Sequence, residues 1–454
     1  MARGICMKND WRQKLHLEPA KGWLNDPNGL SFFGGYYHVY FQYSPESALG
    51  KGQKCWGHFR SKNLTDWEFT GTVLFPDIAE DRSGVYSGCG FVKGDALYLY
   101  YTGNVKEEGD FDYINEGRGA NVILVTTSDG HHMSEKKVLL KNDDYPAYCS
   151  CHVRDPKVWE EDGVYKMVLG ARKRDDTGCV LLYTSSDLYD WKYERVIERP
   201  DFGYMWECPD MFRMGEREYL SISPQGLEHT EYTHQNVYSS GYFADEEMEN
   251  FEEWDYGFDF YAPQTFEAPD GRRLLIGWMG SGDIPYTNPT TLSGWQHCLT
   301  LPREITVSDT GLLLQNPMRE LERLRGEERN FAAGEKIETE LPFEMTGEID
   351  HPEKQTFTID LGAYLRLQYQ DDIFSILFTD DQTGCGRKRR NVKIKDCKKI
   401  RVIADTSSLE IYLDDGQKVL STRFYPEDTK GEISVENLQG VWYPLKGMEV
   451  SGLG

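Results

Sequence analysis

The stretch NDPNGLSFFGGYYHVYFQYS, residues 25–44, has the pattern of a β-hairpin. It begins with polar residues, continues through an apolar segment to Gly34-Gly35, and ends in an aromatic-rich segment. A Gly-Gly pair between two such segments favours a tight turn. The opening Asn-Asp-Pro-Asn-Gly is by itself ordinary turn chemistry, because Pro fixes φ and Asn and Gly tolerate positive φ. Whether Asp26 does more than shape a turn depends on the rest of the chain.

The same pattern occurs five times within residues 25–280, at intervals of about 60 residues. The other copies are YSGCGFVKGDALYLYYTG (86–103), RDPKVWEEDGVYKMVLGAR (154–172), ECPDMFRMGEREYLSIS (207–223) and QTFEAPDGRRLLIGWMG (264–280). A repeat of this length, built from short strands, indicates one supersecondary unit arranged radially. Five units of about four strands each predict an all-β fold, a five-bladed β-propeller.

The predicted propeller brings distant residues together, because the first strand of every blade lines the central channel. The equivalent starts of the five blades carry Asp26, Ser87, Asp155, Glu207 and Gln264. Each carboxylate could simply cap a strand at a turn. Three buried like charges in one funnel are costly, however, unless a reaction needs them. Glycoside hydrolysis uses such a set: a nucleophile or base, a general acid, and often a third carboxylate that holds the sugar.

Composition describes a globular protein with an acidic surface. The 454 residues are 39% hydrophobic and 13% aromatic, and the formal net charge is -25. This charge disfavours nucleic acid and anionic membranes as partners, because phosphate groups attract a basic face. A small-molecule sugar suits an acidic, aromatic-rich chain better. No GxxxxGK[ST] loop is present, and we expect no cofactor.

The sequence predicts a cytoplasmic protein. The N-terminal MARGICMKNDWRQ has no apolar h-region, and no run of about 18 apolar residues could span a bilayer. Ten scattered cysteines without a CxxC pair indicate free thiols in a reducing compartment. The HH pair at 131–132 and CSCH at 149–152 lack a second half-site, so we expect no metal.

Seven motifs in order give the chain a resemblance to glycoside hydrolase family 32, which contains invertases, sucrose-6-phosphate hydrolases and fructan β-fructosidases. They are WLNDPNG (23–29), FQYSP (41–45), WGH (56–58), YSGC (86–89), RDP (154–156), WECPD (206–210) and DFYAPQ (259–264). Each motif alone is weak or moderate. Together they cover nearly the whole chain at the spacing of the repeats, so the resemblance is specific.

The resemblance implies a retaining mechanism with three carboxyl groups. Asp26 would be the nucleophile, Glu207 the general acid and base, and Asp155 the stabiliser of an oxocarbenium-like transition state. We expect the neighbours Trp206 and Cys208 to give Glu207 an apolar setting that favours its neutral form. We expect amides in the NDPN turn to favour the ionised form of Asp26.

The same resemblance implies residues that bind substrate. Hydrogen bonds to the fructosyl unit would come from Asn25, Gln42, Ser87 and Arg154, and aromatic walls from Trp56 and Tyr261. Trp56, within CWGHF, could instead pack between blades. Family members usually have a second Trp shortly before the WGH motif; here it is missing, and Leu49 could fill the space.

The chain divides into three parts by pattern. We expect the propeller over residues 1–315, a linker helix over 316–330 in the charged NPMRELERLRGEERN, and a lectin-like β-sandwich over 331–454, where strand alternation resumes. The sandwich could bind sugar or only brace the propeller, and no cluster of aromatic residues favours the binding interpretation.

The expected substrate is sucrose-6-phosphate or sucrose, because extracellular polymers do not reach a cytoplasmic enzyme. A phosphate group needs basic partners, and the candidates are Lys54, His152, Arg172, Lys173 and Arg174, each of which could equally be ordinary surface charge. Alternatives are action on short fructo-oligosaccharides, a related arabinan hydrolase or fructosyltransferase, and a sugar-binding propeller without turnover.

Overall fold

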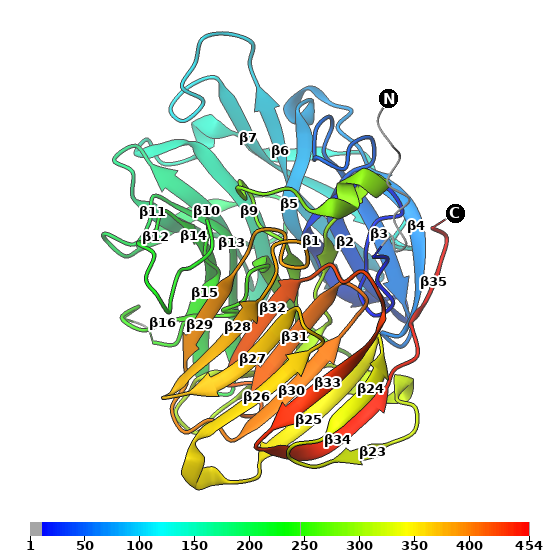
Figure 1. Cartoon of the computed structure of the whole chain (residues 1–454). Helices are drawn as coiled ribbons and strands as arrows, with labels where there is room; N and C mark the ends of the chain where they lie inside the picture. Colours follow the sequence, from blue (N-terminus) through cyan, green and yellow to red (C-terminus); the bar gives the residue numbers. More distant parts are fainter. Residues whose placement is uncertain (1–10, 246, 454) are drawn as a thin grey trace.

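The computed structural model of the chain describes residues 11–245 and 247–453. These residues form seven antiparallel sheets, with two short parallel strand additions (Figure 1). Helix in this part of the chain is limited to 3-10 turns at Ala79–Asp81, Asn142–Asp144, Pro289–Ser293, Arg319–Leu324 and Pro352–Lys354. None of the helical segments in the described ranges has the length and hydropathy needed to cross a membrane. Cys6 and the first ten residues, included in the sequence predictions, lie outside the described residues.

Five sheets follow one another along the chain. The first contains β1 (Gly22–Phe33), β2 (Tyr36–Ser44), β3 (Cys55–Ser61) and β4 (Asp66–Leu74). The second contains β5 (Gly84–Lys93), β6 (Ala96–Lys106), β7 (Arg118–Thr127) and β8 (Lys137–Leu140). The third contains β9 (Cys149–Glu161), β10 (Val164–Lys173), β11 (Gly178–Ser185) and β12 (Lys192–Glu198).

The remaining two sheets complete this series. The fourth contains β13 (Met205–Met214), β14 (Arg217–Gln225), β15 (Gly241–Phe243) and β16 (Phe251–Glu253). The fifth contains β17 (Tyr261–Glu267), β18 (Arg273–Met279), β20 (Cys298–Leu299), β21 (Arg303–Val307) and β22 (Leu313–Pro317). The short β19 (Trp295–Gln296) pairs in parallel with β1, which links the end of the series to its beginning.

The first strands of the five sheets lie against one another in a closed order. β1 contacts β5, β5 contacts β9, β9 contacts β13, β13 contacts β17, and β17 contacts β1. Inner strands are therefore covered on both faces, and β2, YYHVYFQYS, is buried at every position except its first. The outermost strand β12 carries Lys192, Glu194 and Arg195 exposed, as expected for a sheet edge that must stay soluble.

Two six-stranded sheets form the C-terminal sheet pair, residues 329–444. One contains β23 (Arg329–Phe331), β34 (Leu438–Pro444), β25 (Phe343–Ile349), β30 (Lys399–Ala404), β31 (Ser408–Leu413) and β32 (Lys418–Arg423). The other contains β24 (Lys336–Glu340), β33 (Lys430–Glu436), β26 (Thr356–Leu361), β27 (Leu365–Gln370), β28 (Ile373–Phe378) and β29 (Arg389–Lys393).

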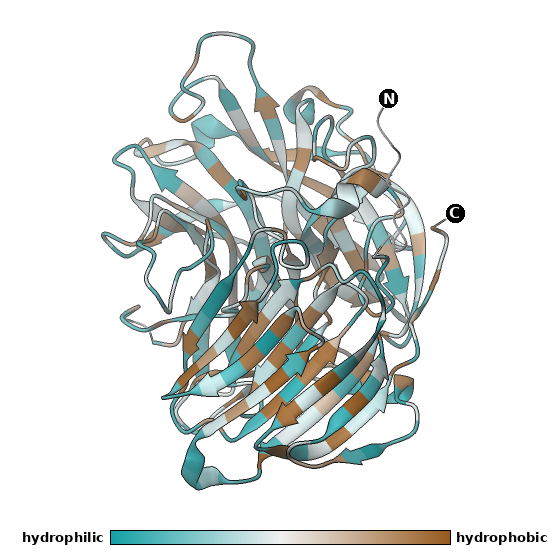
Figure 2. Cartoon of the chain, in the orientation of Figure 1, coloured by the Kyte–Doolittle hydropathy of each residue, from teal (hydrophilic) through white to brown (hydrophobic). Residues whose placement is uncertain are grey.

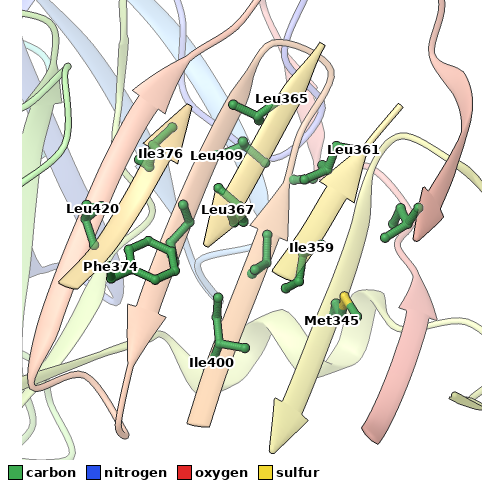
Figure 3. Close-up of a cluster of buried hydrophobic side chains, with 14 of the residues drawn as sticks. Met345, Ile359, Leu361, Leu365, Leu367, Phe374, Ile376, Ile400, Leu409 and Leu420 are labelled. Carbon is green, nitrogen blue, oxygen red and sulfur yellow. The ribbon is translucent and has the colours of Figure 1, made fainter. Parts of the chain in front are cut away.

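The core of the C-terminal sheet pair follows the two-residue period of its strands. In β27, Leu365, Leu367 and Tyr369 are buried while the residues between them are not. Figure 2 shows the matching alternation of hydrophobic and hydrophilic residues along these strands. Leu367 and Ile376 from one sheet and Ile400 and Leu409 from the other enter the same cluster of buried side chains (Figure 3). Burial of one face of each sheet explains why the pattern predicted strands here.

The linker helix expected over residues 316–330 is wrong in extent. β22 continues to Pro317, a 3-10 turn covers only Arg319–Leu324, and β23 begins at Arg329. Leu321 and Leu324 are buried, whereas Arg319 pairs with Glu304 at 2.7 Å. Arg319 and Glu320 therefore bond back to the fifth sheet, Arg325 pairs with Glu344 of the C-terminal sheet pair, and the helical part is confined to one short 3-10 turn.

The C-terminal sheet pair is joined to the five sheets by buried charges. Arg303 of β21 bonds to Asp255 and to Glu410, each at 2.9 Å. His16 lies between Asp405, at 2.8 Å, and Glu410, at 3.0 Å, and all five side chains are fully buried. The last strand, β35 (Glu449–Ser451), leaves the C-terminal sheet pair and pairs in parallel with β4, where Figure 1 shows it beside the first sheet.

Candidate active site

The innermost strand of each of the five sheets is interrupted at the same place by a β-bulge. Two residues there face one residue of the neighbouring strand. The extra pairs are 25–26, 86–87, 155–156, 208–209 and 262–263. Asp155, Cys208 and Ala262 each precede a Pro and have φ of 63°, 46° and 48°, a left-handed conformation that is strained for these residues. The bulges therefore re-aim the chain at one end of all five strands.

The bulges bring Arg154, Glu207 and Tyr261 together, because each immediately precedes the bulge of its strand. Arg154 donates to Oε1 of Glu207 from Nε at 3.0 Å and from Nη2 at 2.6 Å. The Tyr261 hydroxyl donates to Oε2 of Glu207 at 2.6 Å. Gln225, at the end of β14, donates to the same oxygen at 2.7 Å. Both oxygens of Glu207 are thus held by donors from three other strands, β9, β17 and β14.

The expected apolar setting of Glu207 is wrong. Trp206 and Cys208 are its neighbours in sequence, but adjacent residues of a strand point to opposite faces. The Trp206 ring is fully buried in a cluster between the third and fourth sheets. The surroundings of the Glu207 carboxyl group are the polar donors Arg154, Tyr261 and Gln225.

Asp26 lies in the first bulge, and its carboxyl group has three polar neighbours. Ser87 donates to Oδ2 at 2.5 Å, Asn25 donates to Oδ1 at 3.1 Å, and the Cys208 thiol lies 3.8 Å from Oδ2. Burial raises the pKa of Asp26, the bond from Ser87 lowers it, and the charge of Glu207 raises it. The net rise corrects the expectation that the turn amides alone favour ionisation.

The amides of the NDPN segment act mainly on structure. The Asn28 side chain donates to the backbone carbonyl of Asp26 at 3.0 Å, and its Oδ1 accepts the backbone N–H of Gly88 at 2.8 Å. Asn25 accepts from the Trp23 indole at 3.0 Å and donates to Gln42. Asn25 is therefore fixed between Trp23, Gln42 and Asp26.

Asp155 occupies the third bulge beside Cys208. The backbone N–H of Cys208 donates to its Oδ2 at 2.9 Å, and the thiol lies 3.7 Å from the same oxygen. Burial raises the pKa of Asp155 to about 7, although the charge of Arg154 opposes the rise. Thr102 accepts the backbone N–H of Asp155 at 2.8 Å and donates to the Ser87 carbonyl at 3.1 Å. The second and third innermost strands are linked through this hydroxyl.

Three expected site residues lie differently from the prediction. Trp56 is fully buried, with its indole donating to the Tyr86 carbonyl at 3.1 Å, so it packs between sheets and forms no wall of the site. Tyr261 contributes its hydroxyl to Glu207, and its ring is nearly buried. Gln264 follows the bulge, where the ladder has resumed, and donates to the Gly88 carbonyl at 2.9 Å. Leu49 is 53% exposed and does not replace the missing Trp.

The basic candidates separate into two groups. Lys173 pairs with Glu198 at 3.1 Å, and Arg174 donates to the Ala147 carbonyl at 3.2 Å, so neither is directed to the carboxyl groups. His152 accepts from Arg154 at 2.7 Å and donates to the Tyr113 carbonyl at 2.9 Å, which uses both ring nitrogens.

Lys54 lies close enough to Asp26 for their charges to interact, whereas Arg172 contacts Asp176 and the Tyr204 ring. Burial lowers the pKa of Lys54 to about 8, while the charge of Asp26 raises it. The Lys54 ammonium lies 5.3 Å from the Trp23 ring centroid. Arg172 pairs with Asp176 at 2.6 Å and lies 4.7 Å from the Tyr204 ring centroid. Tyr204 in turn bonds through its backbone N–H to the carbonyl of Gln225, the residue that touches Glu207.

Sequence reasoning missed Gln225, Thr102 and Arg118. All three lie outside the innermost strands, and the repeat drew attention only to those strands. A geometric signal was nevertheless available: the second strand of a meander ends, and the third begins, at the edge where the first begins. Gln225 ends β14, Thr102 lies near the end of β6, and Arg118 begins β7.

This arrangement can perform general acid–base and nucleophilic chemistry on a small polar ligand. Asp26, Asp155 and Glu207 come from three different sheets, and Cys208 contacts two of them. Arg154 and Tyr261 hold Glu207, while Ser87 and Asn25 hold Asp26. Preorganised donors around carboxyl groups of this kind are typical of hydrolytic sites.

Comparisons with known proteins agree along the whole chain. The family model described as the glycosyl hydrolases family 32 N-terminal domain matches residues 16–317, and the one described as the family 32 C terminal matches residues 326–450. Sucrose-6-phosphate hydrolase of Bacillus subtilis (strain 168) is 35% identical over 467 residues, covering 96% of this chain and 95% of that protein. Raffinose invertase of Escherichia coli is 36% identical over 455 residues, covering 95% and 93%.

Solved structures give the same relationship. The sucrose-6-phosphate hydrolase from Lactobacillus gasseri superposes with a TM-score of 0.87 at 26% identity, covering 97% of this chain and 94% of that one. A Bombyx mori family 32 β-fructofuranosidase variant in complex with sucrose superposes with a TM-score of 0.84 at 29% identity, covering 98% and 96%.

Proposed function

Because the chain belongs to glycoside hydrolase family 32, we propose that it hydrolyses the β-fructofuranosyl bond of sucrose-6-phosphate or sucrose with retention of configuration. The observation that carries this proposal is the meeting of Asp26, Asp155 and Glu207 at one end of the ring of innermost strands. The names of the Bacillus subtilis and Escherichia coli relatives support the substrate class. No step of this mechanism needs a cofactor.

Asp26 is the nucleophile in this proposal. One of its carboxylate oxygens bonds to the anomeric C2 of the fructosyl unit while the bond from C2 to the glycosidic oxygen breaks. Glu207 gives its proton to the departing oxygen, so the glucosyl product leaves neutral at that atom. Glu207 then takes a proton from water, the water oxygen bonds to C2, and the ester to Asp26 breaks. Two displacements at C2 retain its configuration.

The surrounding residues position these groups. Asp155 binds fructose hydroxyls and stabilises positive charge that develops at C2 in the transition state. Asn25, Gln42, Ser87 and Arg154 bind the fructosyl unit through the amide, hydroxyl and guanidinium groups that already converge on the carboxyl groups. Tyr261 and Gln225 position Glu207 for proton transfer.

We propose that the five N-terminal sheets are the blades of a five-bladed β-propeller and that the C-terminal sheet pair is a β-sandwich. The closed order of the innermost strands and the parallel pairing of β19 with β1 support the first assignment. We place the catalytic domain up to residue 315, the connecting segment over 316–330 and the sandwich over 331–454. The buried charges of Arg303, His16 and Glu410 support a bracing role for the sandwich.

A cytoplasmic location is part of the same proposal. All nine cysteines of the described residues are free, which suits a reducing compartment. In that compartment the enzyme would act on a phosphorylated disaccharide without a cofactor. Its partners would include neither nucleic acid nor a membrane.

The direct test is turnover of sucrose and sucrose-6-phosphate by the wild type, Asp26→Ala and Glu207→Ala. We expect the wild type to release fructose from at least one of the two substrates. Each variant should lose roughly 10³-fold or more in kcat, because removing the nucleophile or the general acid from a group of catalytic residues lowers kcat by factors of this order. A wild type as inactive as both variants on both sugars would contradict the proposal.

A further inference from the structure

Arg118 lies at the end of the second sheet where the carboxyl groups meet. It is the first residue of β7, the third strand of its sheet, which runs parallel to the first strand β5. The loop before it is docked onto β9: Cys151 donates its backbone N–H to the Ile114 carbonyl at 2.7 Å, and His152 bonds to the Tyr113 carbonyl at 2.9 Å. In Figure 1 this loop joins β6 and β7 at the top of the molecule.

The guanidinium of Arg118 forms no ion pair within residues 11–245 and 247–453. Its Nε is buried without a hydrogen-bond partner among the described residues, while the residue as a whole is partly exposed. Burial lowers the pKa of Arg118, although the charges of Tyr86 and Glu207 oppose this. Even partial removal of a cation from water is unfavourable without a partner, so buried guanidinium atoms are usually paired. A cation left in this state is suited to an anionic ligand.

The other basic groups near Arg118 are either paired with carboxylates or neutral. Arg154 is committed to Glu207, and Arg172 is paired with Asp176. His152 is held neutral: burial and then the charges of Arg154, Arg118 and Arg172 lower its pKa to about 3. Of the three guanidinium groups that lower the pKa of His152, only that of Arg118 has no carboxylate partner among the described residues.

The position of Arg118 relative to Glu207 decides which part of a substrate it meets. The loop before Arg118 contacts His152 through the Tyr113 carbonyl, His152 bonds to Arg154, and Arg154 bonds to Glu207. Glu207 protonates the departing glycosidic oxygen in the proposed mechanism, and Asp26 holds the fructosyl carbon. Arg118 therefore lies on the side of the glucosyl group that leaves.

We propose that Arg118 binds the phosphate group on the glucosyl unit of the substrate, with Arg172 as a second cation. This inference rests on the proposed function and names the residue that selects the phosphorylated sugar. A guanidinium matches two phosphate oxygens at once, which makes arginine the strongest single side chain for this ligand. The bound phosphate is then the anionic partner of Arg118.

The kinetic test compares Arg118→Gln and Arg118→Lys with the wild type on both substrates. We expect Arg118→Gln to lower kcat/KM for sucrose-6-phosphate roughly 100-fold, because a desolvated charge-assisted pair is lost, and to change sucrose turnover less than about threefold. Arg118→Lys should recover part of the loss. Arg195→Gln, on the exposed edge strand β12, is the matched control and should change neither substrate. Equal losses on both substrates, or no loss on the phosphorylated one, would overturn the inference.

A binding measurement separates this inference from the hydrolase proposal. Calorimetry with glucose 6-phosphate and glucose needs no turnover. We expect the wild type to bind glucose 6-phosphate more tightly than glucose, and Arg118→Gln to remove the difference. Such selectivity in a protein that hydrolyses neither sucrose nor sucrose-6-phosphate would support the phosphate site and reject the hydrolase proposal. Hydrolysis without such selectivity would reject the role of Arg118 alone.

Discussion

The hydroxyl of Ser87 donates a 2.5 Å hydrogen bond to Oδ2 of Asp26, across the interface between the first and second sheets. The two residues are 61 positions apart and occupy equivalent bulges of their strands. Burial raises the pKa of Asp26, and this bond is the largest influence that lowers it. Ser87 therefore helps to keep the proposed nucleophile ionised.

The first prediction concerns Ser87→Ala. Loss of the bond raises the pKa of Asp26, so a higher pH is needed to ionise it. We expect the acid limb of the pH profile of kcat/KM to move to higher pH, and kcat at the optimum to fall roughly 10-fold. Ser87→Thr keeps a hydroxyl and should retain the wild-type limb. An unchanged limb in Ser87→Ala would show that the bond does not govern Asp26.

The second prediction concerns Tyr261→Phe. The variant keeps the ring but loses the donor to Oε2 of Glu207, so proton transfer is less well positioned. We expect kcat to fall roughly 10-fold, by the same factor for sucrose and sucrose-6-phosphate, because the contact is with the proton-transfer group. Tyr219→Phe is the control, since its hydroxyl donates to the Gly311 carbonyl away from the site. Similar losses in both variants would indicate a general packing effect.

The third prediction concerns the stability cost of Asp155. Burial raises its pKa to about 7 in the folded protein, above its ordinary value of 3.8. The folded state therefore binds more protons than the unfolded state between these values, and the stability contribution of this group falls as pH rises through that window. Asp155→Asn removes the titration. We expect its Tm to rise relative to the wild type between pH 4 and pH 8, while kcat/KM falls roughly 100-fold or more.

A calorimetric pH series on both proteins measures this difference directly. A Tm difference that stays constant across the window would mean that Asp155 is ionised throughout. That result would place the charge of Arg154, and not burial, in control of Asp155.

The fourth prediction concerns the buried charges beneath the site. Burial alone would lower the pKa of His16, but bonds to Asp405 and Glu410 outweigh it and raise the pKa to about 9. Its stabilising effect is therefore complete below pH 6.5 and is lost as pH rises through 9. We expect His16→Gln to reduce the free energy of unfolding at pH 6 by about 3 kcal/mol, because the buried Asp405 loses its cation while Glu410 keeps only Arg303.

Denaturant titration at pH 6 and pH 10 tests this expectation. The difference between the wild type and His16→Gln should shrink at the higher pH. His132→Gln is the control, because His132 is exposed. An equal difference at both pH values would show that His16 is not charged in the folded protein.

Much of this architecture could be predicted from the sequence, because hairpins have local signals. Turn residues between alternating segments located the first two strands of each of the five sheets. The carboxyl groups were found for the same reason: Asp26, Asp155 and Glu207 begin the repeat that the hairpins define. The bulges refine this prediction, since Glu207 precedes its bulge while Asp26 and Asp155 lie within theirs.

What the sequence could not provide depends on contacts between sheets. Trp56 is in a motif of the family, yet its place between two sheets buries it. Residues 316–330 suggested a charged helix because the sequence does not show where their charges pair. Arg319, for example, pairs with Glu304 of another strand. Arg118 belongs to no motif, and only its place at the start of a third strand could have indicated it. That its Nε has no partner in the described part of the chain is known only from the three-dimensional structure, in which the loop before Arg118 bonds to Cys151 and His152.

The measurement that tests the central claim most directly is mass spectrometry of Glu207→Gln after reaction with a β-fructofuranosyl donor whose leaving group needs no protonation. Without a base to activate water, the second step should be slow and the covalent intermediate should accumulate. We predict a mass increase of one fructosyl group on the peptide that contains Asp26, and no increase in the double variant Asp26→Ala/Glu207→Gln. A modified residue other than Asp26, or full turnover of the donor without any adduct, would contradict the assignment of Asp26 as nucleophile.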